Sequence, residues 1–474
     1  MKTILRTFVG CTAILFGTAC MGAVKYVPEN MKVELSLKVP GNNAVNYKLH
    51  PDKLENSYFD YEWRSDNKLP ITVFHKVEER DSCMRLTVQL TAAQDVYFNY
   101  RQLLSTGYRH DNCQFYMPGF WYRRNLRSPK KAPSFHTSDS WLVREDRLSA
   151  PLTGIFSEKE KRFMTVNRLD DFSMDALATH KEGEIILSGK TSLGFTGFEN
   201  QQGIAMLSFG FPYREAPKSY IRKLTLAPEV EAFQLMKKGE SVLLTWEIME
   251  SGADDFSDFI QHTWEHCYDT YAPKPVENSY SIADMKQVLS CFFVNSLVDN
   301  QPLVYNSGIH LKVSDCERNG QAEVGFIGRV LLNAFNAWEY GWQSNREELK
   351  VNSTKIFDSY LKNGFTQAGF FKESVNFDKG YEEPVHSIRR QSEGVYAMFH
   401  FLAYEKENGR RHPEWEQKLK RILDMFLQLQ NVDGSFPRKF RDDLTIVDPS
   451  GGSTPSATLP LVMGYKYFKD KRYL

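Results

Sequence analysis

The sequence predicts a multidomain β + α protein, in which an N-terminal antiparallel β-sandwich is followed by a helical domain. Two observations support this prediction. Apolar residues recur at every second position from Met31 to about Glu250, and at helical spacing beyond about residue 280. Between the two regions, residues 272–275 contain two prolines, which oppose both helix and sheet. A chain of 474 residues is also long enough for two or three domains.

The composition is close to that of a soluble globular protein. Lys plus Arg and Asp plus Glu each number 59, so the formal net charge is +0, and hydrophobic residues make up 42%. This balance argues against a strong electrostatic attraction to nucleic acid or to an anionic membrane surface. Aromatic residues reach 14% of the chain. Such an excess is expected where rings stack on ligands, and it also builds large cores.

The first 19 residues have the order of an export signal. Basic residues precede an apolar run over residues 7–16, which is too short to span a bilayer, and small residues follow. Cleavage after Ala19 would leave Cys20 first, as in a bacterial lipoprotein signal, although Gly17 stands where an aliphatic residue is usual. We expect an exported protein, periplasmic or outer-membrane-associated, with Cys20 as a candidate lipidation site.

The β-sandwich is predicted over residues 24–270. Residues 33–39, 84–90 and 242–248 alternate strictly between apolar and polar, which marks strands with one buried face. Many such strands between Gly, Pro and Asn indicate a sandwich. Export permits disulfides, so Cys83–Cys113 is a candidate bridge, and buried free thiols are the alternative. Residues 271–280 are predicted to be a linker.

Residues 281–474 are predicted to form helical hairpins in which outer and inner helices alternate. Three amphipathic helices are marked by capping pairs at Ser281/Asp284 and Ser344/Glu347 and by a first-turn Pro413. Three further segments are apolar almost all round and must therefore be buried. These segments are Val324–Trp338, Val395–Tyr404 and Leu459–Phe468.

The starts of the inner helices repeat at intervals of about 65–70 residues, at Glu323, Glu393 and Ala457. A helix-hairpin repeat of this length is too long for tetratricopeptide or HEAT units and fits the hairpins of an α/α toroid. About three hairpins are present, and six would need roughly 200 further residues. We therefore expect an incomplete toroid, either a piece of a longer protein or an open half-toroid.

A secreted β-sandwich, a short linker and alternating outer and inner helices resemble the six-hairpin (α/α)6 glycosidase superfamily. The resemblance covers residues from about 31 to 474. Lyases with toroids usually carry the sandwich after the helices, so the order here is similar to that of glycoside hydrolases and phosphorylases. The resemblance implies a bacterial secreted glycan-degrading protein whose partner is a carbohydrate polymer or oligosaccharide. The balanced charge predicts no nucleic-acid partner, and a membrane contact is expected only through a lipid anchor at Cys20.

In that superfamily the site lies where long loops lead into the inner helices. Here three such segments, 314–329, 382–393 and 431–456, bring together Asp, Glu and Arg. Glycoside hydrolysis needs two carboxyl groups, one protonated and one ionised. Burial raises the pKa of the first, and neighbouring Arg residues keep the second ionised.

The catalytic candidates are Glu323, Glu393 and Asp433, because each enters or shortly precedes an inner helix. Arg389 or Arg390 would orient an ionised partner. Each carboxylate also has a structural interpretation. An acidic residue in the first helical turn complements the helix dipole, and Asp433 precedes a Gly as turn-forming residues do.

Four aromatic residues are candidates for stacking on sugar: Trp342, Phe436, Trp121 and Tyr122. The last two belong to the segment 115–125, which is rich in aromatic residues and Arg. This segment either reaches over the toroid mouth to hold sugar or a uronate, or fills a domain interface.

No metal or cofactor is predicted. Asp442, Asp443 and Asp448 are oxygen donors that calcium could use, but their spacing fits no EF-hand, and neither Cys-x-x-Cys nor His-Glu-x-x-His occurs. The leading hypothesis is a secreted glycoside hydrolase-like protein that acts on complex polysaccharide with two carboxylates. The alternatives are a non-catalytic glycan-binding or structural lipoprotein and, as a minor one, a polysaccharide lyase with Tyr or His as base.

Overall fold

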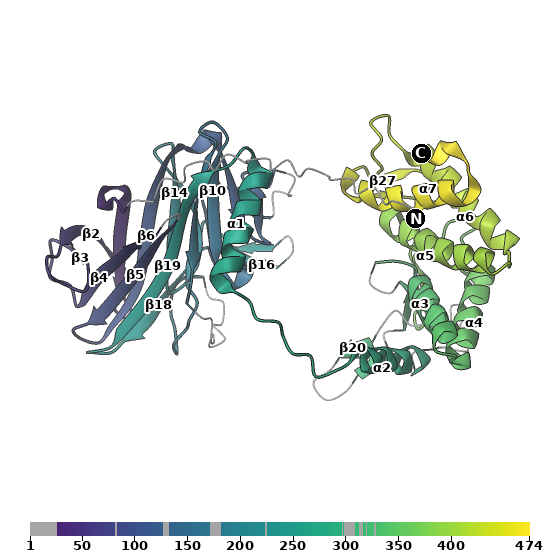
Figure 1. The fold of residues 1–474 in the computed structure, drawn as a ribbon, viewed down its shortest axis with the longest axis horizontal. Helices are drawn as coiled ribbons and strands as arrows, with labels where there is room; N and C mark the ends of the chain where they lie inside the picture. Colours follow the sequence, from purple (N-terminus) through teal and green to yellow (C-terminus); the bar gives the residue numbers. More distant parts are fainter. Residues whose placement is uncertain are drawn as a thin grey trace, which may run out of the picture. The chain divides into compact units, whose positions relative to one another are not determined.

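The computed structural model describes residues 26–80, 83–126, 132–170, 182–222, 225–295, 297, 309–311, 316–318, 320–326 and 329–474. The chain forms two compact units, one up to Lys274 and one from Pro275 onward (Figure 1). The predicted export signal and Cys20 lie outside the described residues. None of the helices in the described ranges is long and apolar enough to cross a membrane.

The first unit is built on a seventeen-stranded sheet that bends into two layers, which share β2 (Val45–Lys53). All paired strands are antiparallel except β12 (Gly183–Ile186) and β18 (Val230–Met236). From β2, one layer runs through β1 (Met31–Lys38), β6 (Val96–Arg109), β14 (Ile204–Phe211), β13 (Phe195–Gln201) and β9 (Trp141–Arg144). The other runs through β3 (Tyr61–Arg64), β4 (Ile71–Glu79), β5 (Cys83–Ala92), β19 (Ser241–Gly252), β11 (Arg162–Arg168), β10 (Leu152–Ser157), β7 (Cys113–Met117) and β8 (Trp121–Arg123). The strands β15 (Arg214–Glu215), β16 (Ser219–Arg222) and β17 (Thr225–Ala227) complete the unit.

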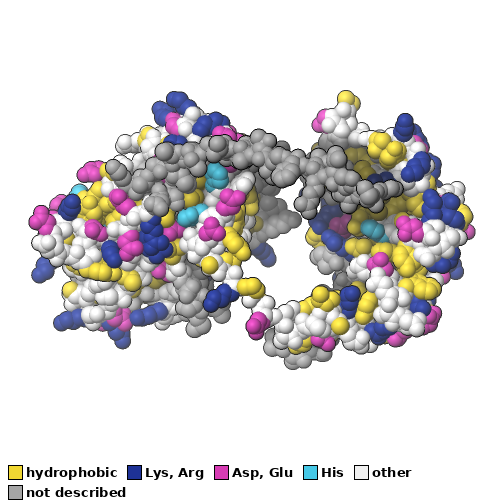
Figure 2. Space-filling view, viewed as in Figure 1, with side chains coloured by type: hydrophobic (Ala, Val, Ile, Leu, Met, Phe, Trp, Pro, Cys, Tyr) yellow, Lys and Arg dark blue, Asp and Glu magenta, His cyan; other side chains and the backbone are white. Residues whose placement is uncertain are grey.

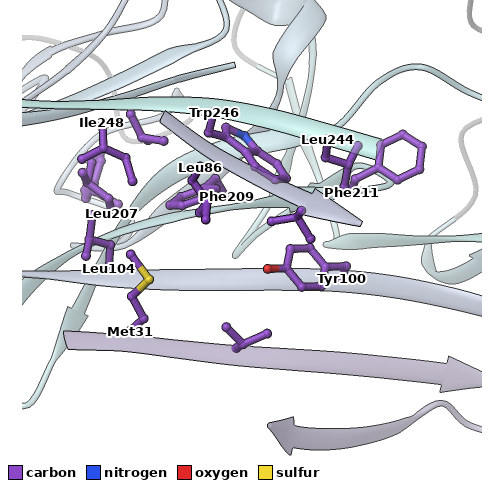
Figure 3. Close-up of a cluster of buried hydrophobic side chains, with 14 of the residues drawn as sticks. Met31, Leu86, Tyr100, Leu104, Leu207, Phe209, Phe211, Leu244, Trp246 and Ile248 are labelled. Atoms are coloured by element: carbon purple, nitrogen blue, oxygen red, sulfur yellow. The ribbon is translucent and has the colours of Figure 1, made fainter. Parts of the chain in front are cut away.

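The two layers meet in one aromatic-rich core (Figure 3). Across it, the rings of Phe115 and Phe198 lie 4.0 Å apart and those of Phe209 and Trp246 lie 5.1 Å apart. The predicted alternation is confirmed in β5, where the four apolar residues at positions 84, 86, 88 and 90 are all buried. Burial of one face of each strand is therefore what holds the layers together.

A helix within the predicted β region was missed. Residues 256–271 form α1 (Phe256–Tyr271), which begins at the N-cap Asp255. Its apolar residues recur at helical spacing and pack on the outer face of the second layer, with Phe259 4.9 Å from the ring of Phe163. Of the two alternatives for Cys83 and Cys113, buried free thiols are confirmed: both residues are free and buried, and Cys113 Sγ donates to a backbone carbonyl oxygen.

The second unit contains six helices among its described residues: α2 (Ile282–Asn295), α3 (Val330–Gln343), α4 (Glu347–Asn363), α5 (Ile388–Glu407), α6 (Pro413–Leu429) and α7 (Thr454–Phe468). The three predicted inner helices correspond to α3, α5 and α7, and α5 contacts both of the others. The predicted burial of Leu459–Phe468 is wrong in part, because α7 is buried on one side only and Leu459 is 50% exposed. α4 packs beside α3, and α6 packs beside α5 and α7 (Figure 1). The predicted first-turn position of Pro413 is confirmed.

The helical unit departs from the prediction by containing short strands in its loops. These are β20 (Ile309–Leu311), β21 (Cys316–Arg318), β22 (Gln321–Glu323), β23 (Ser374–Asn376), β24 (Tyr381–Glu382), β25 (His386–Ser387), β26 (Lys439–Phe440) and β27 (Ile446–Asp448). Strands of two or three residues are too short to show alternation, so periodicity could not find them. Because the predicted inner helix began six residues early, at 324, part of this loop was also mistaken for helix.

The caps of the outer helices were predicted with mixed success. The Ser281/Asp284 pair is confirmed, since each backbone N–H donates to the other side chain. The Ser344/Glu347 pair is wrong, because Ser344 Oγ donates to Tyr340 O and Arg346 precedes α4. Most of the apolar residues of α2 are exposed (Figure 2). α2 instead turns polar residues toward its neighbours, with Gln287 Oε1 3.0 Å from Arg346 Nη1.

Candidate functional site

The loops before α3, α5 and α7 are joined edge to edge by backbone pairing. β22 before α3 pairs with β23 before α5, with Glu323 opposite Ser374. β25, at the start of α5, pairs with β26 before α7, with His386 opposite Phe440. These pairings bring together the loops that enter the three predicted inner helices. Side chains from all three loops therefore lie at one end of the helical unit.

Arg390 links two carboxyl groups from different loops. It sits in the first turn of α5, where its Nη2 lies 3.6 Å from Glu323 Oε1 and its Nη1 lies 3.8 Å from Glu373 Oε2. Glu323 comes from β22 and Glu373 immediately precedes β23, so the pairing of these two strands places both carboxyl groups beside the same guanidinium. The guanidinium of Arg390 thus contacts the carboxyl groups of both Glu323 and Glu373.

Glu373 is buried, and the pKa of its carboxyl group is strongly raised. Its exposed fraction is 1%, and burial raises the pKa of the carboxyl group to about 8. The backbone N–H of Ser387 donates to Oε1, and Gln391 Nε2 donates to the same oxygen at 3.2 Å. These bonds and Arg390 favour the ionised form, but the loss of hydration is the larger effect. Glu373 therefore keeps its proton near neutral pH.

The sequence interpretation missed Glu373. The residue lies outside the three loop segments from which the candidates were drawn, 314–329, 382–393 and 431–456. Its spacing to Glu323 and Glu393 fits no periodic pattern, because its place is set by the pairing of β22 and β23. The available signal was weak: it is the first carboxylate after a pair of phenylalanines, both of which are buried.

Glu393 anchors the loop that leads into α3. Its Oε2 accepts the backbone N–H of Phe326, while its Oε1 lies 3.1 Å from Arg389 Nε and 3.5 Å from Arg329 Nη2. Arg389 also stacks over the Phe326 ring, with its guanidinium carbon 4.8 Å from the ring centre. Gly325 permits this close approach, because a Cβ there would lie 2.8 Å from the Arg390 backbone. Glu393 thus holds the loop beside Arg389 and Arg390.

His386 lies between the buried Glu373 and the half-exposed Asp442. His386 Nε2 lies 2.6 Å from Asp442 Oδ1, and its Nδ1 lies 4.0 Å from Glu373 Oε1. The ring is buried between Phe370 and Phe440. Asp442 is half-exposed and lines a surface groove of about 670 Å³ between α6 and the following loop.

Asp433 lies in a separate exposed turn. Its Oδ1 accepts the backbone N–H of Ser435 at 2.9 Å and the Ser435 hydroxyl at 2.6 Å. These two bonds lower the pKa of the Asp433 carboxyl group. No described contact links it to Glu323, Glu393 or Arg390, so the structure supports the turn-forming interpretation rather than a place in the cluster.

The aromatic candidates are mostly unsuited to stacking on sugar. Phe436 and Trp121 are buried in the cores of their units, so their rings cannot meet a ligand. Trp342 is 47% exposed, but it lies at the far end of α3, about 18 Å along the helix from the loop cluster. Tyr122 is 52% exposed in the β unit, where it lines a pocket of about 850 Å³ with Arg123 and Arg124. Two rings near the loop cluster are exposed, that of Phe326 at 41% and that of Tyr381 on β24 at 49%.

The candidate calcium donors are already engaged by the protein. Asp442 binds His386, Asp443 accepts the backbone N–H of Thr445, and Asp448 accepts that of Ser450.

The cluster around Arg390 offers acid–base chemistry: a protonated carboxyl group, an ion-paired carboxylate and guanidinium groups that can orient an anion.

No family model matches the chain, and no curated protein matches it. Solved structures match it weakly. A D-mannose isomerase is 10% identical with a TM-score of 0.32, over 42% of this chain and 50% of its own. A polysaccharide lyase is 11% identical with a TM-score of 0.31, over 93% of this chain and 73% of its own. The cellobiose 2-epimerase of Spirochaeta thermophila is 13% identical with a TM-score of 0.31, over 41% of this chain and 53% of its own. Matched regions thus span about half of the isomerase and the epimerase, and likenesses this weak carry no functional argument.

Proposed function

We propose that the helical unit cleaves glycans with the carboxyl groups of Glu323 and Glu373, which lie on either side of Arg390. The supporting observation is that one guanidinium contacts both groups while only one of them is deeply buried. Burial raises the pKa of Glu373 to about 8, so it can donate a proton at neutral pH. Glu323, ion-paired to Arg390, is then the base or nucleophile of a two-carboxylate mechanism.

In this scheme the substrate takes the place of part of the Arg390 side chain. Arg390 separates the two carboxyl groups in the free protein, and a sugar oxygen reaches Glu373 once the guanidinium moves aside. Catalytic hydrogen bonds commonly form only in the substrate complex. The half-exposed Arg329 and Arg389 would hold an anionic group of the glycan, and the Phe326 ring would stack on a sugar face.

One observation favours a second function, non-catalytic glycan binding. Glu373 is 1% exposed, and hydrogen bonds and the nearby Arg390 engage both of its oxygens. These contacts are also consistent with a structural role, in which Glu373 anchors the start of α5. The exposed Arg and Phe side chains would then bind carbohydrate without any bond cleavage.

Turnover on a panel of plant and host glycans separates the two functions. We expect the full chain to release new sugar ends, and Glu323→Gln to lower the rate about 10²–10⁴-fold, because an amide can neither ionise nor take a proton. Asp433→Asn is the matched control and should keep the wild-type rate, since its side chain lies in the exposed turn. Ultraviolet absorbance of an unsaturated product would identify a lyase.

Each outcome of this experiment bears on one part of the proposal. Binding of a glycan with no turnover by the wild-type chain would establish the binding function instead. Turnover that is equal in the wild type and in Glu323→Gln would keep the enzyme but reject this site.

We further propose that the protein is exported and processed at Ala19, with Cys20 as the acylated first residue. The order of charged, apolar and small residues supports this. Mass spectrometry of the mature chain should show a diacylglyceryl group on Cys20. An intact Met1 on protein from the native cell would reject export, and an unmodified N-terminus near residue 20 would reject the lipid anchor alone.

A further inference from the structure

Three different metal-binding side chains meet beneath α1 in the β unit. They are the thiol of Cys83 on β5, the carboxylate of Glu247 on β19 and the imidazole of His266 on α1. One donor atom from each lies within 4.8 Å of the other two. His266 Nε2 and Glu247 Oε1 are 2.8 Å apart. Nothing in the proposed glycan chemistry uses these residues, which belong to the other unit.

The sheet register explains why the first two donors face the helix. β5 and β19 pair antiparallel, with Cys83 opposite Met249 and Arg85 opposite Glu247. Side chains two residues apart point to the same side of a strand, so Cys83 and Glu247 share the face that α1 covers. The cluster is therefore preformed by two rigid strands and one helix that packs across them.

We propose that Cys83, Glu247 and His266 bind a divalent metal ion of the zinc type. Sulfur, nitrogen and oxygen donors together are the ligand set that zinc accepts, and calcium or magnesium would take oxygen donors alone. Three protein ligands leave the fourth tetrahedral position for water. Zinc bonds of about 2.0–2.3 Å place tetrahedral ligand atoms about 3.3–3.7 Å from one another. The His266–Glu247 pair at 2.8 Å therefore has to open and the wider separations, up to 4.8 Å, have to close, in each case by roughly 1 Å.

The neighbouring groups are compatible with an ion at this place. Cys83 and Glu247 are both buried, while His266 reaches the surface and provides an entry route. Arg85 Nη2 lies 3.5 Å from Glu247 Oε2, so it can remain on that oxygen while Oε1 turns to the metal. Thr270 Oγ1 donates to Oε1 at 3.0 Å and would support the ligand from outside. The metal would replace the thiol proton of Cys83, which passes to solvent.

Zinc binding to the full chain tests the proposal directly. We expect one zinc ion per chain in competition with a chromophoric chelator, and a cobalt(II) complex with the absorption band of a thiolate ligand. Cys83→Ser and His266→Gln should each weaken binding by more than about 100-fold, because each removes a direct ligand. Glutamine keeps an N–H for Glu247, so His266→Gln should fold even if the apo protein depends on that contact.

The controls are matched in residue type and position. Cys113→Ser removes another buried thiol, and His262→Gln removes another histidine of α1, so both should bind zinc like the wild type. The proposal is overturned if the wild-type chain binds no zinc, if Cys83→Ser and His266→Gln bind as tightly as the wild type, or if the cobalt complex lacks the thiolate band. None of these results depends on whether the helical unit cleaves glycans.

Discussion

Glu373→Gln is expected to remove a loss of stability that Glu373 causes in the helical unit as the pH rises from about 4.5 to 8. Loss of hydration raises the pKa of the folded carboxyl group to about 8, from an ordinary value of 4.5. In this window the folded protein keeps the proton and the unfolded chain releases it. The contribution of Glu373 to stability is therefore complete below pH 4.5 and is lost as the pH rises through 8.

The size of this effect should be easy to measure. The gap between the two pKa values corresponds to roughly 4–5 kcal/mol of unfolding free energy, since each pKa unit is worth about 1.4 kcal/mol. Thermal unfolding of the full chain, followed by helical circular dichroism at several pH values, gives the two profiles. Glu382→Gln is the control, because its half-exposed carboxylate pairs with Lys372 at the surface. Parallel wild-type and Glu373→Gln profiles would show that Glu373 is ionised in the folded protein.

Arg168→Met is expected to destabilise the β unit by about 3–5 kcal/mol. Arg168 Nη1 lies 2.7 Å from Glu145 Oε2, and both side chains are almost completely buried. Glu145 Oε2 also accepts the backbone N–H of Gly194 at 2.7 Å. This one neutral donor would remain after Arg168 is replaced, and it does not supply a positive charge. Methionine leaves a carboxylate in the core without its counter-charge, and burial already raises the pKa of Glu145.

The comparison needs an ion pair of the same type at the surface. Arg109 and Asp111 lie 3.0 Å apart and are both well exposed, so Arg109→Met should leave the denaturation midpoint unchanged. Chemical denaturation is followed by tryptophan fluorescence, which reports on both units, because Trp246 lies in the core of the β unit and Trp338 and Trp415 lie in that of the helical unit. The transition of the β unit is the one that Arg168→Met should shift. Equal midpoints for Arg168→Met and the wild type would mean that the buried pair contributes no net stability.

Patterns over a few neighbouring residues correctly predicted the features that depend on those residues alone. The alternation of β5 and the capping pair of α2 follow from neighbouring residues alone, and both are present in the structure. The helix α1 was missed because it follows the last strand, β19, directly and lies inside the region that was predicted to be a β-sandwich. Its spacing, with Phe256, Phe259, Thr263 and Cys267 buried, was nevertheless visible in the sequence.

The candidate site was predicted by its loops and not by all of its residues. Glu323, Glu393, Arg389 and Arg390 lie in one cluster, although the last three belong to the first two turns of α5 rather than to a loop before it. Asp433 was predicted to lie there by the same argument, but it lies in a separate exposed turn, where its carboxylate accepts hydrogen bonds from the backbone N–H and the hydroxyl of Ser435. Burial of Trp121 and Phe436 likewise follows from packing, which composition cannot distinguish from ligand stacking.

The sequence by itself determined the change from sheet to helix, the order of the helices and the loops that meet at one end. These features depend on periodicity and on turn residues, which act over a few positions along the chain. Only the tertiary structure decided that Glu373 is the carboxyl group that keeps its proton, and that Cys83, Glu247 and His266 meet beneath α1. Burial and proximity between residues far apart in sequence arise from strand pairing and packing, because loss of hydration acts on a side chain through everything that surrounds it.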